Sequence, residues 1–256
     1  MKKTVIALAV VASAAVSCSA MAWTGDGSGG SVEFGGTLTP EKMLTPWEVK
    51  VGSAVTDLDA LIQKGQQVVD VTAKKAIPIL GIRTMQKTAF KGRVGIDPKI
   101  NYNNAVQFGN MRDGGAELIL DILDAGDAKI GTLRTAILAG AGIVRDSYYF
   151  SAYDDGAAFE GGLGKAAGQV VNQPAALEAK LNSIDPEFTA NIDKTNAGAV
   201  ATWNAGSFDN ETKHFSAYYG SGIEAGNIIK ITLDTPAAGD APIVWKASLP
   251  VTVSYQ

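Results

Sequence analysis

Few side chains in this sequence have the types and spacing that catalysis or metal binding needs. His214 is the only histidine, which excludes a multi-histidine metal site and leaves a Ser-His-Asp triad with one possible base. It lies in the polar stretch 210–216, a context that favours an ordinary surface histidine. Cys18 is the only cysteine, and it lies near the N-terminus. We therefore expect no enzyme, no metal and no cofactor.

The glycine-rich and acidic segments do not match ligand-binding loops either. Gly161–Lys165 differs from a phosphate loop in its glycine spacing, and Ala166 follows the lysine. Gly25–Gly30 has no predicted strand before it, as a dinucleotide-binding loop requires. The aspartates of segment 121–127 lack the spacing of a calcium loop.

One segment could bind a ligand at the surface: Ser147–Asp155, which reads S-Y-Y-F-S-A-Y-D-D. Aromatic rings beside carboxylates can stack on a sugar face and accept hydrogen bonds from its hydroxyl groups. The alternative is a strand whose aromatic side chains pack in the core, and the sequence leaves both open. The candidate receptor contacts are Tyr148, Tyr149, Tyr153, Asp154 and Asp155.

The N-terminus has the pattern of a secretory leader. Lys2 and Lys3 precede the apolar stretch 4–16, and Ala20-Met21-Ala22 is an A-x-A cleavage site. We predict a signal peptide over 1–22 and export of a chain without cysteine and therefore without disulfides. Lipid attachment at Cys18 is the weaker alternative, because Ala15 stands where such a site has leucine. The net charge of −4 argues against nucleic acid as a partner.

Most of the remaining chain reads as β-structure. Apolar and polar residues alternate in short segments separated by turn residues, the pattern of a β-sandwich. Asp124–Asp127 is a good hairpin turn, and Pro78 indicates an edge strand or a bulge. The predicted strands are Trp47–Val51, Gln67–Thr72, Ala76–Leu80, Glu117–Leu123, Lys129–Leu138, Asn227–Leu233 and Val244–Ala247.

The middle of the chain departs from this pattern. Asn172–Ser183 contains Pro174 near a helix start and apolar residues at helical spacing, and Asp185-Pro186-Glu187 is a second helix start. We predict a small helical insertion over about 143–200. Such an insertion carries function or covers a sheet edge, and the sequence leaves both open.

The two ends of the exported chain alternate most clearly. Val32, Phe34, Gly36 and Leu38 share one parity behind a glycine-rich tail, and Leu249, Val251, Val253 and Tyr255 share one parity at the C-terminus. A tail followed by such a strand indicates segments that complete sheets in other molecules.

These residues give the chain a family resemblance. It resembles the kappa-class chaperone–usher fimbrial subunits of enterotoxigenic Escherichia coli, whose major subunit is itself the adhesin. The match begins in the leader M-K-K-T-V-I-A-L-A and is weak over about 143–200, beyond Phe159–Gly162. The other matching segments are Trp23–Asp26, Gly30–Gly36, Trp47–Gly52, Pro78–Gly81 with Arg83-Thr84, Gly131-Thr132, Ala205–Phe208, Gly222–Gly226 and Pro250–Tyr255.

The resemblance implies an incomplete immunoglobulin-like β-sandwich that is completed by donor-strand exchange. Residues 23–40 would be the donor-strand extension and residues 41–256 the pilin domain, with the terminal strand beside the groove that chaperone or donor fills. The implied partners are identical or related subunits, a periplasmic chaperone, an outer-membrane usher and a host glycoprotein or glycolipid. The implied location is a cell-surface fimbrium, reached through the periplasm.

Other classes remain open at this stage. The weak match in the insertion also fits a minor structural subunit without receptor binding. A soluble periplasmic or lipid-anchored binding sandwich would explain the leader and the strands, though not the glycine-rich tail. A secreted hydrolase would need a carboxylate pair that the sequence does not place.

Overall fold

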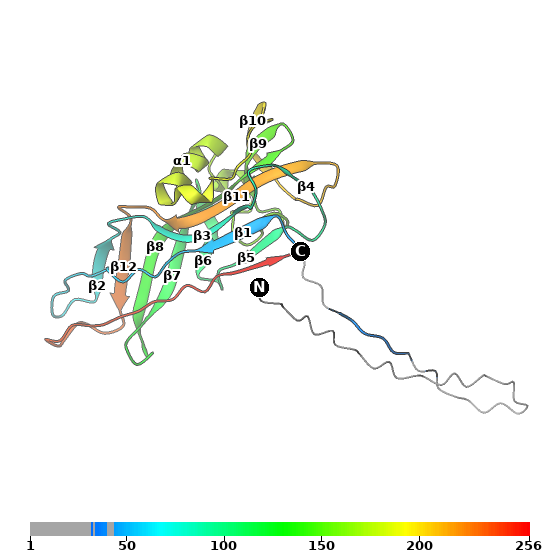
Figure 1. Cartoon of the computed structure of the whole chain (residues 1–256). Helices are drawn as coiled ribbons and strands as arrows, with labels where there is room; N and C mark the ends of the chain where they lie inside the picture. Colours follow the sequence, from blue (N-terminus) through cyan, green and yellow to red (C-terminus); the bar gives the residue numbers. More distant parts are fainter. Residues whose placement is uncertain (1–31, 33, 40–43) are drawn as a thin grey trace, which may run out of the picture. The chain divides into compact units, whose positions relative to one another are not determined.

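The longest strand, β8 (Lys129–Arg145), organises the fold (Figure 1). The computed structural model describes residues 32, 34–39 and 44–256, and the chain divides into unit 1–43 and unit 44–256. The first half of β8 alternates in burial, whereas residues 137–144 are all buried. The first half therefore has one covered face, and the second half is covered on both.

Several strands flank β8 in unit 44–256. Its first half pairs with β7 (Gly115–Leu123) and β12 (Ile228–Leu233), and its second half with β9 (Tyr148–Tyr153) and β11 (His214–Ile223). One path through this sheet runs β1-β3-β11-β8-β12-β2, and β13 pairs with β5 in a second sheet. The remaining strands are β1 (Trp47–Val51), β2 (Val68–Thr72), β3 (Ile77–Thr84), β4 (Phe90–Lys91), β5 (Pro98–Asn101), β6 (Val106–Arg112), β10 (Ala199–Ala205) and β13 (Thr252–Tyr255).

The turn between β7 and β8 forms where the sequence predicts it. The Asp124 carboxylate accepts hydrogen bonds from the backbone N–H groups of Gly126 (2.8 Å) and Ala128 (3.0 Å). Asp127 takes the left-handed conformation, with φ of 66°, which aspartate tolerates better than most residues. The predicted hairpin is confirmed.

Pro78 lies at a bulge inside the sheet. β3 pairs with β1 on one side and with β11 on the other, and the β3–β11 register shifts between Ser221 and Gly222. A bulge tolerates proline because it leaves one residue outside the ladder. Of the two alternatives predicted for Pro78, the bulge is correct and the edge strand is wrong.

Two predicted elements are absent from the described structure. Residues 244–247 make only an isolated bridge, between Lys246 and Leu123, because β7 ends there at its hairpin. The second helix start gives only the 3-10 turn η2 (Pro186–Phe188), with the Asp185 carboxylate capping the Glu187 N–H. A second 3-10 turn, η1 (Ala167–Gln169), precedes the helix.

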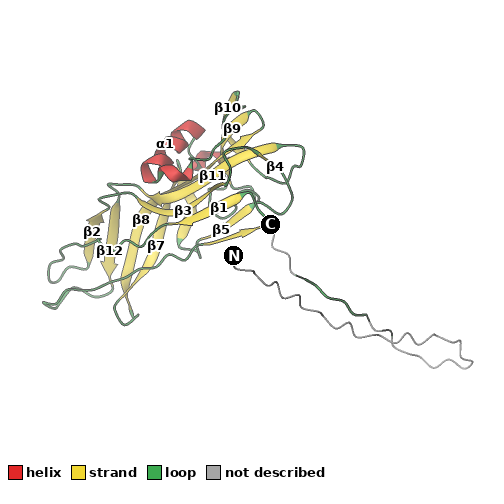
Figure 2. Ribbon diagram, viewed as in Figure 1, coloured by secondary structure: helices red, strands yellow, loops and turns green. Residues whose placement is uncertain are grey.

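The helix of the insertion forms as predicted and lies over the sheet (Figure 2). α1 (Pro174–Ile184) has proline in its first turn and buries Leu177, Leu181 and Ile184 against β8 and β11. It therefore covers a face of the sheet rather than an edge. The prediction of a mainly β fold with a small helical insertion is confirmed.

Two glycines in the sheet make room for Phe188, the last residue of η2. Gly81 of β3 and Gly220 of β11 are register partners. A Cβ atom at either position would lie 2.5 or 2.6 Å from the ring of Phe188, closer than real contacts allow. The missing side chains therefore form the hollow that holds this ring.

A second core lies on the other face. Trp47, Phe90, Phe159, Phe208 and Phe215 form a chain of aromatic contacts with ring centroids 4.8 to 5.9 Å apart. Within the described residues, no helix is both long enough and apolar enough to cross a membrane.

We predict that Gly220→Ala destabilises the subunit, by about 1–3 kcal/mol, because the added methyl group displaces Phe188. The matched control is Gly168→Ala, where a Cβ atom meets nothing within 4 Å. Thermal unfolding of both variants gives the comparison. Equal stabilities of the two variants would show that the Phe188 hollow is not tightly packed.

Candidate functional site

The candidate site is an open groove between the end of β1, with the segment that follows it, and the segment that precedes β13. Each of these two strands has one free edge within the described unit. Among the described strands, β1 pairs with β3 alone and β13 with β5 alone. The Tyr255 hydroxyl of β13 lies near Thr45, just before β1, whereas Val51 and Val251 line one groove at the other end. β1 and β13, the blue and red arrows of Figure 1, therefore run antiparallel without pairing.

The groove has an apolar floor and apolar rims, and its volume is about 790 Å³. Leu118 and Leu120 of β7 contribute to the floor, and their alternation within 117–123 made them recognisable as one face of a strand. Their place under a groove was not recognisable, because it depends on distant strands. The other apolar side chains that line it include Leu133, Ile223 and Ile229, and at the rims Val51, Val55, Ile77, Ile79, Trp245, Leu249 and Val251.

The valines of β1 are the clearest sign that a covering element is missing. Val49 and Val51 have the parity of the buried Trp47, and they pair with the buried Ile82 and Leu80 of β3. Their exposed fractions are nevertheless 42% and 62%. A strand whose core-facing positions are exposed lacks its cover in this unit.

The C-terminal strand behaves as the sequence predicts. Val253 and Tyr255 are half-buried, whereas Thr252 and Ser254 between them are exposed. Leu249 and Val251 precede the strand and line the groove. Burial raises the pKa of Tyr255.

The predicted donor residues lie in the N-terminal unit. Val32, Phe34 and Leu38 are exposed, and Gly36 has no neighbour within 4 Å of a Cβ position. Residues 1–31, which include the predicted leader and Ser31, lie outside the described part of the chain, as do 33 and 40–43. The donor role of these residues stays a prediction.

The aromatic-acidic segment requires a correction, because Tyr149 and Asp154 are buried. The Tyr149 hydroxyl donates to Glu178 of α1 (2.9 Å) and lies 2.9 Å from the Tyr218 hydroxyl. Burial and the neighbouring Tyr218 and Glu178 raise its pKa. The assignment of Tyr149 as a receptor contact is wrong, because α1 covers it.

Asp154 has a structural role in the following loop. Its carboxylate accepts hydrogen bonds from the backbone N–H groups of Gly156 (2.9 Å) and Gly161 (3.0 Å). It too is wrong as a receptor contact. Of the predicted contacts, Tyr148 and Asp155 are exposed and Tyr153 is half-buried.

His214 is exposed at the start of β11, as the sequence predicts. Its backbone N–H donates to the Asp146 carboxylate (2.9 Å). Among the described residues, no three His, Cys, Asp or Glu side chains gather in a way that could hold a metal ion.

Comparison with known proteins gives a full-length match. The family model of K88-type fimbrial proteins, described as major and minor fimbrial subunits, matches residues 1–256. The chain is 29% identical to K88 fimbrial protein AB and 30% identical to K88 fimbrial protein AC, both of Escherichia coli. It is 29% identical to the F41 fimbrial protein of the same species. Each alignment covers 100% of both chains.

We predict that Val51→Cys and Val200→Cys both react with a maleimide in the free subunit, since each valine is 62% exposed. Cys18 is the only natural cysteine, so Cys18→Ser leaves one reporting thiol. A peptide of residues 31–38, added at about 100 times its Kd, should slow labelling at position 51 about a hundredfold. Labelling at position 200, on the distant β10, should not change. Unchanged labelling at position 51 would mean that the peptide does not enter the groove.

Proposed function

Because the chain belongs to the K88-type family of major and minor fimbrial subunits, we propose that its subunits join by donor-strand exchange. Residues 31–38 of one subunit lie between β1 and β13 of the next. The observation that carries this proposal is the apolar groove at the end of β1 and before β13, together with the free edge that each of these strands has among the described strands. Because β1 and β13 are antiparallel, the donor pairs in parallel with one and antiparallel with the other.

Favourable binding of the donor strand requires both burial of its side chains and hydrogen bonding of its backbone. Burial of Val32, Phe34 and Leu38 gives about 5–9 kcal/mol together, and ordering eight residues costs about 8–16 kcal/mol. About eight backbone hydrogen bonds to the two free edges add about 4–12 kcal/mol. The balance is favourable only when the donor fills the groove and pairs with both edges.

The proposal includes assembly partners that act before the donor arrives. An exposed apolar groove between free strand edges is a site of aggregation in water. A periplasmic chaperone would fill the groove after export, and an outer-membrane usher would exchange it for the donor strand of the next subunit. The finished subunit is then part of a cell-surface fimbrium.

Adhesion is the second part of the proposal. The exposed Tyr148 and Asp155 and the half-buried Tyr153 offer a ring and carboxylate surface to a host glycoprotein or glycolipid. This surface involves no residue that lines the groove. The alternative is a minor structural subunit that assembles without receptor binding.

The donor role of residues 31–38 predicts a strong effect of Phe34→Asp. An unpaired carboxylate in the apolar groove costs several kcal/mol, so fibres should not form. The variant's own groove is intact, so export and chaperone binding should persist. The matched control is Thr37→Asp, which puts the same charge on the opposite parity and should still polymerise. The measurement is the ladder of polymers on an unboiled gel, and normal fibres from Phe34→Asp would exclude the donor role.

The adhesive role predicts that Tyr148→Ala weakens fibre binding to epithelial cells about three- to tenfold, through loss of ring stacking. Tyr148→Phe keeps the ring and should bind normally if stacking is the main contact. Fibre assembly should be unchanged in both variants, because the groove is intact. Undiminished adhesion of the Ala variant would favour the structural subunit.

A further inference from the structure

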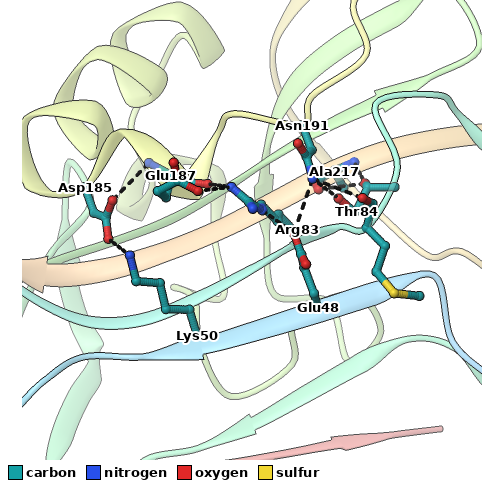
Figure 3. Close-up of polar contacts among 9 residues, drawn as sticks. Glu48, Lys50, Arg83, Thr84, Asp185, Glu187, Asn191 and Ala217 are labelled. Atoms are coloured by element: carbon teal, nitrogen blue, oxygen red, sulfur yellow. Dashed lines mark hydrogen bonds and ion pairs between the residues drawn. The ribbon is translucent and has the colours of Figure 1, made fainter.

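The outer face of β1 is fastened to the insertion by charged side chains (Figure 3). Glu48 and Lys50 have the parity opposite to Val49 and Val51, and Glu48 is the register partner of Arg83 on β3. The Arg83 guanidinium donates both to Glu48 and to the Glu187 carboxylate, at 2.8 Å in the second case. Its third acceptor is the backbone carbonyl of Glu187.

A second ion pair lies two residues further along β1, at Lys50. The Lys50 ammonium group lies 2.7 Å from the Asp185 carboxylate, whose other oxygen caps the Glu187 N–H at 2.9 Å. Asp185 and Glu187 both lie at η2, the turn whose Phe188 occupies the hollow over Gly81. We name Glu48, Lys50, Arg83, Asp185 and Glu187 the insertion brace.

The guanidinium group is the centre of this arrangement. The Arg83 side chain is 23% exposed, and burial alone would lower its pKa. The hydrogen bonds and charges of Glu48 and Glu187 outweigh that effect and leave its pKa above the ordinary value. Asn191 adds a neutral contact, since its amide donates to the backbone carbonyl of Thr84 at 2.9 Å.

β1 has few other anchors in the unit. It is hydrogen-bonded along one edge only, and Val49 and Val51 on its groove side are exposed. At its start, the Trp47 indole donates to the Ile96 carbonyl at 2.7 Å. Edge strands with little apolar burial open locally at low free-energy cost. Past Trp47, the ladder to β3 and the contacts of the outer face therefore hold β1 when the groove is empty.

We propose that the insertion brace positions β1 for the incoming donor strand, so that the insertion sets how tightly a subunit retains its neighbour. This inference rests on the proposed donor-strand function. The ion pairs are partly exposed and add little to global stability. Their effect is on the position of one groove wall, and a donor that pairs with a loosened wall dissociates faster.

The test compares ion pairs that involve β1 with one that does not. The brace variant is Glu48→Gln with Lys50→Met. The control is Lys180→Met, which removes the 2.7 Å pair between α1 and Asp113 in the turn after β6. Both are made in the mature chain carrying Phe34→Asp, so that subunits do not polymerise. The readout is the dissociation rate of a fluorescent peptide of residues 31–38.

We expect the peptide to dissociate about fivefold faster from the brace variant and at the original rate from the control. The melting temperatures of the two variants should be similar. Raising the salt concentration to about 1 M should accelerate dissociation from the brace variant less than from the braced chain. The brace variant has already lost the ion pairs that salt weakens.

Two results overturn the inference and are distinguishable. Equal dissociation rates for the braced chain and the brace variant exclude a positioning role and leave donor-strand exchange intact. Failure of the braced chain to bind the peptide excludes donor-strand exchange, and the inference with it. If the double variant is less stable than the control, Glu48→Gln alone decides, since Lys50 still pairs with Asp185.

Discussion

Among the described strands, β1 and β13 each leave a row of backbone N–H and C=O groups without a strand partner, and an apolar groove lies between the end of β1 and the segment before β13. Unpaired backbone groups and exposed apolar surface are both unfavourable for a folded domain, and here one gap has both. A helix or loop laid over the gap would cover the floor but leave the edges unpaired. A single extended segment with apolar residues at every second position meets both requirements, and residues 32–38 have that pattern.

The opposite face of the sheet is closed by the chain itself. α1 and η2 cover β8, β11 and β3, where Gly140, Gly220 and Gly81 leave room for Leu177 and Phe188. A side chain at these glycines would hold the insertion away from the sheet. The described unit thus has one face that its own insertion fills and one with an open apolar groove, and β1, whose end borders that groove, belongs to the sheet that the insertion braces.

The sequence predicted the strands well because alternation is a local property. The β7–β8 hairpin, the terminal strand and α1 all lie where the pattern indicates. Alternation does not say what covers each face, and this explains why the exposure of particular side chains could not be predicted. Tyr149 is buried because α1, some 25 residues later in the chain, lies over it. Val49 and Val51 are exposed because no strand of the described unit covers them.

The brace was beyond sequence reasoning for a related reason. Glu48, Arg83 and Glu187 are distant in the chain, and only the β1–β3 register and the position of η2 bring them together. Each residue alone reads as an ordinary surface charge, and surface ion pairs usually contribute little. Here the charges act on an edge strand with one uncovered face, so a small local free energy changes where that strand lies. The same small energy would go unnoticed on a central strand such as β8, which has partners on both sides. Weak pairs therefore matter most on a strand with a free edge, and the insertion provides them at β1.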